Sequence, residues 1–331
     1  MQRELLVGLV GAGWAAREHC ISLARVGGAR VAGVVDVAPE SAERLAAEFG
    51  GHVCESVEEL LNANGLDAIV VATPSGLHRE AVVPALEQGI ATFVEKPLAR
   101  SMADADAIVK AAEKTGAICA VGYQWRALNE MLQMGTSFAA QPIALMISSG
   151  IGVTQSRPWF DDGQLSGGVL FERVSHHIDI QRMLAGEVRS VSAVSGDVSL
   201  SGLASSLDEC DDVLSLTLVF ASGAVGAVHV VSTPSDYPTT QSLRILTTTG
   251  TYDLELDPAF VLRAQADDES GTGQWRAEEE PFLRQMRRFL LAAQEGDQSL
   301  VCCTPSDAAE TLRVATAAER SLSQNVIMTL K

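Results

Sequence analysis

Up to residue 122, short apolar runs alternate with amphipathic stretches. Several runs are continuous Val, Ile and Ala, which is typical of parallel strands covered on both faces. The pattern predicts strands over residues 5–10, 30–36, 52–54, 67–72, 91–95 and 117–121, and helices over residues 14–26, 40–49, 57–64, 77–88 and 102–114. Repeated β-α units of this length predict a doubly wound parallel sheet with right-handed crossovers.

After Gly122 the pattern changes to alternating apolar and polar residues separated by turns, which indicates hairpins. It predicts strands over residues 143–149, 188–194, 214–220, 224–232, 242–248 and 251–256, and helices over residues 281–295 and 305–324. A mostly antiparallel sheet leaves one face free for helices or a partner subunit. The chain is therefore expected to be α/β with two domains, residues 1–122 and residues 123–331.

Composition narrows the range of partners. The 331 residues carry 24 Lys and Arg against 42 Asp and Glu, a net charge of −18, which repels nucleic acid and anionic membrane surfaces. The six cysteines form no C-x-x-C pair and match no zinc spacing, so we expect reduced cysteines, a cytoplasmic protein and no metal site. No apolar run is long enough to span a bilayer.

The first predicted strand leads into Gly11-Ala-Gly13-Trp-Ala-Ala16, a G-x-G-x-x-A sequence that opens a helix. Gly11 permits the tight turn, Gly13 lets the backbone approach a pyrophosphate, and Ala16 lets the helix pack closely on the strand. The second strand ends in Asp36, about twenty residues further on, where an acid binds the ribose hydroxyls of a dinucleotide. The pattern predicts a dinucleotide site; the alternative is a doubly wound domain that has lost its ligand.

Asp36 also bears on the choice of cofactor. The 2′-phosphate of NADP would meet a like charge there, at a cost of up to about 4 kcal/mol at contact distance. No arginine follows to offset it, because the next residues are Val37 and Ala38. We therefore expect NAD rather than NADP.

Several motifs, taken in order, resemble those of the glucose–fructose oxidoreductase / inositol dehydrogenase / MocA family. The resemblance covers nearly the whole chain. The matching segments are the glycine motif followed by His19, Ala72-Thr-Pro-Ser-Gly-Leu-His78, Glu95-Lys96-Pro97, Gly122-Tyr-Gln-Trp-Arg126, and Ser166-Gly-Gly168 with Glu172, His176 and Asp179.

The resemblance implies a Rossmann domain joined to an α/β domain whose open antiparallel sheet often builds oligomers. It implies an NAD-dependent dehydrogenase that moves a hydride between nicotinamide and the hydroxyl-bearing carbon of a sugar or cyclitol, as a homodimer or homotetramer. Three alternatives stay open: a keto-sugar reductase in a biosynthetic pathway, redox-neutral cleavage of a glycoside through transient oxidation, and a non-catalytic NAD-sensing regulator.

The resemblance also implies roles for single residues. Lys96 would hydrogen-bond the reacting oxygen, and His176 would be the general base, with Glu172 four residues earlier on the same helical face. The family more often has Asp at the Glu172 position. His177 is the neighbouring candidate, but its register on a helix points it elsewhere, so we expect a packed or surface histidine.

Further residues are expected around the cofactor and the substrate. His19 and His78 are interpreted as structural residues near the dinucleotide, and Trp14 either covers the cofactor or packs. Asp179 orients the site or pairs with Arg182. The expected cofactor residues are Gly11, Gly13, Trp14, Ala15, Asp36, Thr73, Pro74, His78, Glu95 and Lys96, and the expected substrate residues are Tyr123, Arg126, Trp159 and Asp179.

Overall fold

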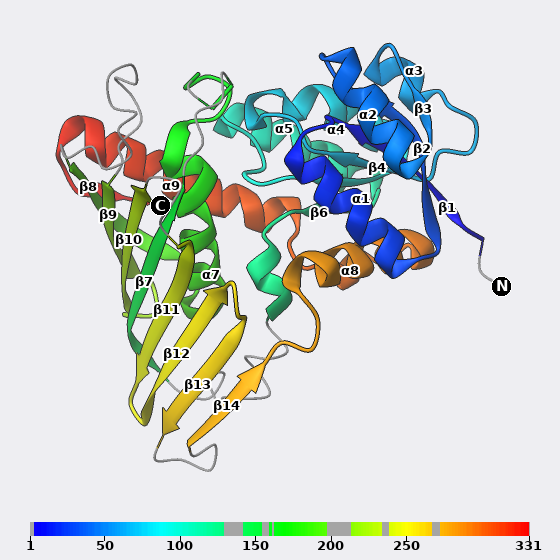
Figure 1. Ribbon diagram of the computed structural model, residues 1–331. Helices are drawn as coiled ribbons and strands as arrows, with labels where there is room; N and C mark the ends of the chain where they lie inside the picture. The colour runs from blue at the N-terminus through cyan, green and yellow to red at the C-terminus, as the bar shows by residue number, and fades with distance from the viewer. Residues whose placement is uncertain are drawn as a thin grey trace. The chain divides into compact units, whose positions relative to one another are not determined.

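The computed structural model describes residues 3–128, 142–153, 159–160, 162–196, 213–233, 238–266 and 272–330. The chain forms two compact units, both visible in Figure 1. The first unit contains residues 1–127 and 279–309, and the second contains residues 128–278 and 310–331. Each unit is therefore assembled from two separate segments of the chain.

The first unit contains a six-stranded parallel sheet in the order β3-β2-β1-β4-β5-β6. This is the strand order of dinucleotide-binding folds, and it confirms the doubly wound prediction. The carboxyl ends of all six strands lie at one edge of the sheet. The strands are β1 (Leu5–Val10), β2 (Ala29–Val35), β3 (His52–Val53), β4 (Ala68–Val71), β5 (Ala91–Val94) and β6 (Cys119–Val121).

The helices of the first unit begin and end where local sequence signals lie. Ser56 and Ser101 cap two helices by accepting the backbone N–H of Glu59 and Asp104. Gly116, with φ of +68°, ends the helix that Ser101 caps, in the left-handed conformation that glycine favours. The helices are α1 (Trp14–Val26), α2 (Pro39–Phe49), α3 (Val57–Leu61), α4 (His78–Glu87), α5 (Met102–Thr115) and α8 (Pro281–Glu295), with short 3₁₀ turns η1 (Ser75–Leu77), η2 (Gln124–Leu128) and η5 (Gln298–Leu300).

Helix α8 has the bounds expected from the sequence, but it packs in the first unit, whereas the pattern placed residues 281–295 in the second domain. The reason is its apolar face. Met286, Phe289 and Leu290 are buried in one core with alternate residues of β1 and with the inner face of α1. The chain then pairs with β6, since the Gln298 side chain bonds both the N–H and the C=O of Cys119.

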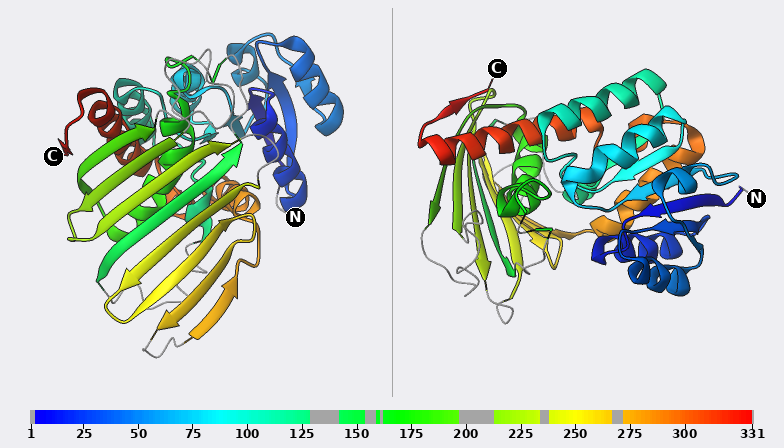
Figure 2. Two further views of the ribbon diagram at one scale, coloured as in Figure 1. Left: turned by 60° about the vertical axis from the view of Figure 1, so that its left-hand side comes forward. Right: turned by 90° about the horizontal axis from the view of Figure 1, so that it is seen from above.

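The second unit contains a nine-stranded sheet, whose strands lie side by side in the left view of Figure 2. Its order is β14-β13-β12-β11-β7-β10-β9-β8-β15, and only the β7–β10 pair is parallel among the described pairings, as predicted. The sequence pattern did not predict β13, β14 or β15. The strands are β7 (Ile143–Val153), β8 (Val188–Gly196), β9 (Val213–Phe220), β10 (Val225–Thr233), β11 (Thr240–Thr247), β12 (Gly250–Asp257), β13 (Val261–Ala266), β14 (Thr272–Arg276) and β15 (Met328–Thr329).

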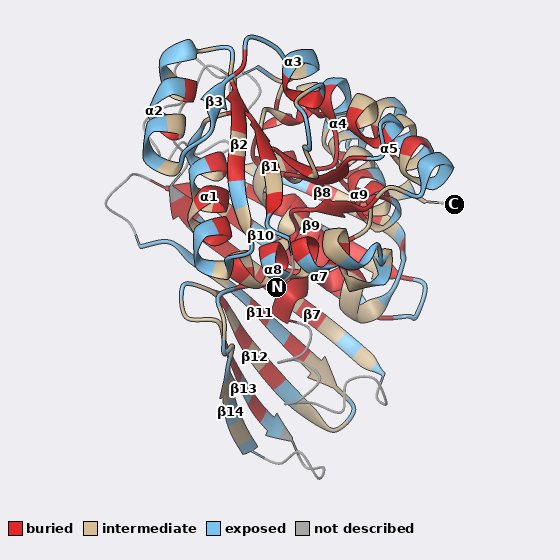
Figure 3. Ribbon diagram, turned by 90° about the vertical axis from the view of Figure 1, so that its right-hand side faces the viewer, coloured by how far each residue is buried: buried red, intermediate tan, exposed pale blue. Residues whose placement is uncertain are grey.

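The two faces of this sheet differ in burial, as the alternating colours along its strands in Figure 3 show. On β7, Met146 and Ser148 are fully buried, whereas Leu145 and Ile147 are partly exposed. Helix α7 (Ser175–Ala185), which continues a π-helical turn η4 (Leu170–Val174), packs on β7 and β10. The second part of α9 (Pro305–Gln324) is tied to β8, where the Ala193 N–H donates to Ser321 Oγ. Within the described ranges, no helix combines the length and apolar character needed to cross a membrane.

Candidate active site

The loop after β1 requires glycine at one position and leaves open space at another. Gly11 has φ of +95°, and a Cβ there would lie 2.6 Å from the Ala72 carbonyl oxygen. Both observations exclude a side chain. Gly13 precedes α1, and a Cβ there would meet no atom of the described residues within 4 Å. No described residue therefore blocks the N-terminus of this 13-residue helix, where the N–H groups and the positive end of the dipole favour an anion.

Asp36 follows β2 and fixes this loop. Its Oδ2 accepts the Ala12 N–H at 2.6 Å, and its Oδ1 accepts the Ala38 N–H at 2.8 Å. Each carboxylate oxygen keeps a further acceptor position, which a ribose hydroxyl can use. Trp14 and Val37, on either side of this loop, are 62% and 98% exposed.

The loop after β4 presents an unsatisfied hydroxyl to the same edge of the sheet. Thr73 Oγ1 is buried and has no hydrogen-bond partner in the part of the chain that the structure describes. His78 is fully buried, and its Nε2 and Nδ1 lie 2.9 Å and 3.2 Å from the carbonyl oxygens of Thr73 and Leu98. Burial lowers the pKa of His78, and the two carbonyls only partly oppose this. His78 thus holds the Thr73–Pro74 turn from behind.

Lys96 follows β5, and its neighbour Glu95 is buried beneath it. Glu95 Oε1 lies 2.7 Å from His19 Nε2, and Glu95 Oε2 accepts the Lys96 backbone N–H at 3.1 Å. Burial raises the pKa of Glu95, but the hydrogen bond and electrostatic attraction from His19, with the charge of Lys96, outweigh it, so the net pKa is lowered. His19 stacks on Phe282 at a centroid distance of 4.5 Å. Glu95 therefore holds the backbone of Lys96 in place.

These features fit a dinucleotide. The strand ends of the first unit bring together a glycine turn at a helix N-terminus for the pyrophosphate, Asp36 for the ribose, and the buried Thr73 hydroxyl. Ala15, in the first turn of α1, and Pro74 lie in the same two loops and are partly buried. Lys96 is partly exposed at the same edge.

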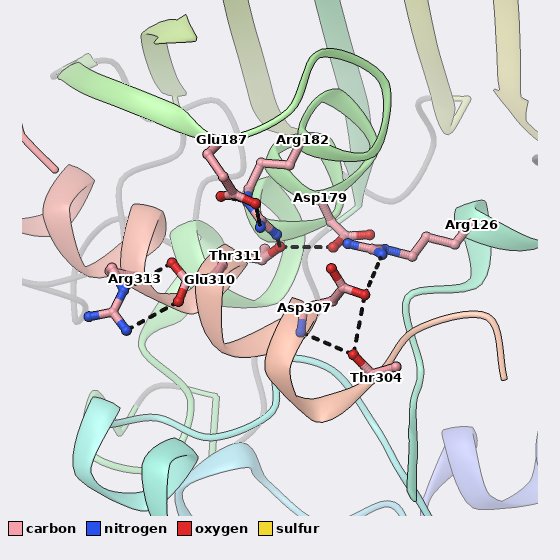
Figure 4. A network of polar contacts seen from close by, with 9 residues as sticks. All are labelled: Arg126, Asp179, Arg182, Glu187, Thr304, Asp307, Glu310, Thr311 and Arg313. Atoms are coloured by element: carbon pink, nitrogen blue, oxygen red, sulfur yellow. Dashed lines mark hydrogen bonds and ion pairs between the residues drawn. The ribbon is translucent and has the colours of Figure 1, made fainter. Parts of the chain in front are cut away.

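Two of the expected substrate residues lie near β6. Tyr123 is 1% exposed and lies two residues after the end of β6. Arg126 is also buried and forms an ion pair of 3.3 Å with Asp307, in the first turn of α9 (Figure 4). Thr304 caps that turn by accepting the Asp307 N–H. In the first unit, Arg126 thus offsets the negative charge of Asp307 at the N-terminus of α9.

In the second unit, Glu172 and His176 lie in one helical segment. Glu172 is in the π turn η4, His176 is in the first turn of α7, and both are partly buried. π turns are frequent at functional sites, and no signal in the sequence distinguished this one from an ordinary helix. The segment is preceded by Ser166, whose hydroxyl donates to the Phe160 carbonyl at 2.6 Å and accepts the Gly168 N–H.

His177 faces the sheet instead. It is 1% exposed, and its Nε2 lies 2.9 Å from Gln241 Oε1 on β11. Burial lowers the pKa of His177 to about 4; the hydrogen bond with Gln241 opposes this shift, and the nearby Arg173 adds to it. Of the two alternatives that the sequence left open for His177, a packed or a surface histidine, the structure has the buried one.

Asp179 is also buried, as part of a network that Figure 4 shows. The Thr311 hydroxyl of α9 donates to Asp179 Oδ1 at 2.8 Å and accepts from Arg182 Nη1 at 2.8 Å. Arg182 also binds both carboxylate oxygens of Glu187. Thr311 thus links Asp179 to Arg182. The sequence analysis did not identify Thr311 as a member of this network.

Trp159 is the last of the expected substrate residues. Its side chain is partly buried and packs edge-on against Phe160, with a distance of 5.9 Å between the ring centroids.

Comparison with family models gives two matches. Residues 5–123 match the model described as "Oxidoreductase family, NAD-binding Rossmann fold", named GFO_IDH_MocA. Residues 141–253 match the model of the GFO/IDH/MocA C-terminal domain. The two matches together include most of the chain and fall on the two sheets described above.

Individual proteins are similar over long stretches. The chain is 30% identical over 237 residues to scyllo-inositol 2-dehydrogenase (NAD(+)) of Bacillus subtilis, covering 70% of this chain and 69% of that protein. It is 28% identical over 229 residues to 2,7-anhydro-N-acetylneuraminate hydratase of Mediterraneibacter gnavus, covering 64% of this chain and 58% of that protein. The chain spans about three fifths of the length of several curated relatives that it matches.

Solved structures share the fold. Levoglucosan dehydrogenase, in a complex with NADH and L-sorbose, superimposes with a TM-score of 0.84 at 21% identity over the full length of both chains.

We expect alanine substitutions at the two glycines of the β1 loop to have different effects, one on NADH binding and the other on stability. Gly13→Ala should keep the wild-type melting temperature, because its Cβ meets no protein atom, but should weaken NADH binding at least about tenfold by obstructing the pyrophosphate. Gly11→Ala should lose about 1–3 kcal/mol of stability through strain and contact with Ala72. Thermal unfolding and NADH fluorescence titration measure both. Unchanged NADH affinity in Gly13→Ala would contradict the proposed position of the pyrophosphate.

The burial of His177 predicts a pH dependence of stability. The unfolded chain takes up the proton near pH 6.5, whereas the folded protein resists it down to about pH 4, so stability is complete above pH 6.5 and is lost as pH falls toward 4. From pH 7.5 to 5.0 the wild type should lose about 2 kcal/mol more than His177→Gln in urea unfolding. The exposed His52→Gln serves as control and should behave like the wild type. Equal losses in wild type and His177→Gln would refute the assignment.

Proposed function

Because the chain belongs to the GFO/IDH/MocA oxidoreductase family, with its NAD-binding Rossmann fold, we propose that it is an NAD-dependent oxidoreductase acting on a CH–OH group of a sugar or cyclitol. The observation that carries the proposal is the arrangement at the strand ends of the first unit. A dinucleotide cradle and a lysine held by a buried carboxylate occur there at one sheet edge. The activity of the inositol dehydrogenase relative supports the substrate class.

Bound NAD supplies a hydride acceptor for the carbinol carbon. The Lys96 ammonium donates a hydrogen bond to the reacting oxygen and stabilises its developing negative charge. His176 accepts the hydroxyl proton on its imidazole, the side-chain group that most often serves as general base in enzymes. Glu172 stands one helical turn before His176 and orients the imidazole or the substrate hydroxyl. The alcohol thus loses a hydride and a proton and becomes a ketone.

NAD is favoured over NADP by the environment of Asp36. Both carboxylate oxygens already accept backbone N–H groups, so the side chain cannot turn away from a 2′-phosphate without breaking them. The neighbouring Val37 and Ala38 offer no positive charge.

A second candidate is a reaction with no net redox change. The similarity to a hydratase of 2,7-anhydro-N-acetylneuraminate favours it, since hydration changes no overall oxidation state. In that case NAD would be consumed and regenerated within one turnover. Product analysis distinguishes the two, because only the dehydrogenase accumulates NADH.

The purified protein should reduce NAD, and NADP more slowly, with at least one member of a panel of inositols, aldoses, sugar acids and simple alcohols, followed by NADH absorbance. Lys96→Ala and His176→Ala should each lower kcat at least about 100-fold, since each removes a group that handles the proton or the charge. Their NADH affinity should stay within about threefold of wild type.

Lys110→Ala, an exposed lysine on α5, is the matched control and should keep full activity. Wild-type turnover in Lys96→Ala, or tighter binding of NADPH than of NADH, would overturn the assignment. NADH binding without turnover of any substrate would favour a keto-sugar reductase or a non-catalytic sensor.

The proposal includes a homo-oligomer formed through the face of the nine-stranded sheet opposite α7, which no helix covers among the described residues. Leu145, Val225 and Val219 form one row across β7, β10 and β9, and none of them is buried. Adjacent apolar side chains on an uncovered sheet face are typical of a subunit interface.

Val225→Glu should therefore shift the mass measured by light scattering from a dimer or tetramer toward the monomer, because it places a charge within that row. Leu291→Glu, at an equally exposed leucine on α8, should leave the mass unchanged. A wild-type protein that is monomeric at micromolar concentration would contradict the proposal.

A further inference from the structure

The η4–α7 segment contacts the sheet through three polar side chains spaced four residues apart, which we call the polar ladder: Arg173, His177 and Gln181. Arg173 Nη1 donates to the Gly152 carbonyl at 2.8 Å. His177 Nε2 lies 2.9 Å from Gln241 Oε1. Gln181 Nε2 donates to Ser148 Oγ at 2.8 Å and to the Ala227 carbonyl at 3.0 Å.

Each step of the polar ladder lies over a glycine of the sheet. A Cβ at Gly152 would collide with the Arg173 guanidinium, and one at Gly226 would collide with Gln181 Oε1. A Cβ at Gly150 would lie 2.5 Å from Gln241 Oε1 and 2.8 Å from His177 Nε2.

The backbone itself does not demand glycine at these positions. None of the three has a positive φ, so each could hold an L side chain without strain. Glycine weakens a strand interior, and it is typical of places where another group approaches the backbone closely. We conclude that the close approach of the polar ladder to the sheet, and not the backbone conformation, favours glycine at these positions.

Stability alone would be served better by apolar contacts. Burying polar groups costs free energy unless each is hydrogen-bonded, and His177 and Gln181 are 1% and 0% exposed. Apolar packing tolerates a helix that slides or turns slightly, whereas hydrogen bonds require defined directions and distances. The polar ladder, whose side chains lie over glycines of the sheet, therefore fixes the rotation of the helix about its axis and its distance from the sheet.

Glu172 and His176 each precede a member of the polar ladder by one residue. One residue corresponds to about 100° in an α-helix such as α7 and to a smaller angle in the π turn η4, so fixing Arg173 and His177 also fixes the directions in which Glu172 and His176 project. We propose that Arg173, His177 and Gln181, with Gly150, Gly152 and Gly226, are positioning residues that orient His176 and Glu172 for the reaction. This inference rests on the proposed function for its effect on turnover, but not for its effect on His176.

The sharpest test is a steric one. Gly226→Ala places a methyl group against the Gln181 amide and should displace the helix. We expect kcat to fall about 10- to 100-fold with KM changed less than threefold, since misplacement of about 1 Å can cost that much. The double variant Gly226→Ala/Gln181→Ala removes the colliding amide and should turn over faster than Gly226→Ala alone.

A second readout does not depend on turnover. The imidazole of His176 is followed by NMR in histidine-labelled protein and assigned by its loss in His176→Gln. Its titration midpoint and chemical shift should change in Gly226→Ala and return toward wild type in the double variant. If no substrate is turned over, the proposed function fails while this readout still decides the positioning role.

Leu254→Ala is the control for general destabilisation, because Leu254 is buried on β12 away from the polar ladder. It should lower the melting temperature but leave kcat and the His176 signal unchanged. The proposal is overturned if Gly226→Ala leaves both unchanged, or if Leu254→Ala changes them equally. Should Gly226→Ala fail to fold, Gln181→Ala, which removes two of the hydrogen bonds without adding a steric clash, must lower kcat and shift the His176 signal in the same direction, by less than a variant with a clash.

Discussion

The first unit depends on a carboxylate that is buried at the end of β5. An ionised carboxylate away from water is costly unless positive or hydrogen-bonding groups surround it. Glu95 meets this requirement with His19 from α1 and with the N–H of Lys96. Gly122 makes room for it, because a Cβ there would lie 3.2 Å from the carboxylate. Helix α1, which opens the glycine loop, and the strand that carries Lys96 are thus held to each other through one charge.

In the second unit, hydrogen bonds hold the helix that carries His176. Its sheet is assembled by ordinary alternation, with apolar residues such as Met146 and Leu216 buried on one face. The helix that carries His176 does not simply rest on these apolar residues. Its hydrogen bonds to the sheet, and those of Asp179 and Arg182 to Thr311, hold it on two sides.

Local patterns predicted most elements of both units, because apolar periodicity and capping residues act over a few positions. The range of α8 was predicted correctly, yet its place in the first unit was not. Periodicity shows that Met286 and Phe289 share an apolar face, but not which surface covers that face. Strand β14 was missed because its burial alternates only weakly at the edge of the sheet.

The candidate site was also predicted only where local sequence patterns apply. The glycine loop, Asp36 and Lys96 follow from motifs, and the burial of His177 agrees with the register that favoured His176. The pairing of Asp179 with Arg182 was considered from their spacing, but Thr311 is 132 residues from Asp179, and no local rule could identify it. The π turn at Glu172 depends on hydrogen bonds rather than on residue types. The roles of Lys96, His176 and Glu172 remain predictions.

The division of the first unit between two chain segments also affects its biosynthesis. The core against β1 and α1 includes Met286, Phe289 and Leu290, and Phe282 covers His19. On the ribosome, residues 128–278 are made before these side chains exist, which takes roughly 10–30 seconds at about 5–20 residues per second. During that interval the nascent Rossmann sheet exposes an apolar face that has no cover from α8. A chaperone that binds apolar surface would find its target there, before the protein has acquired either its full core or its complete site.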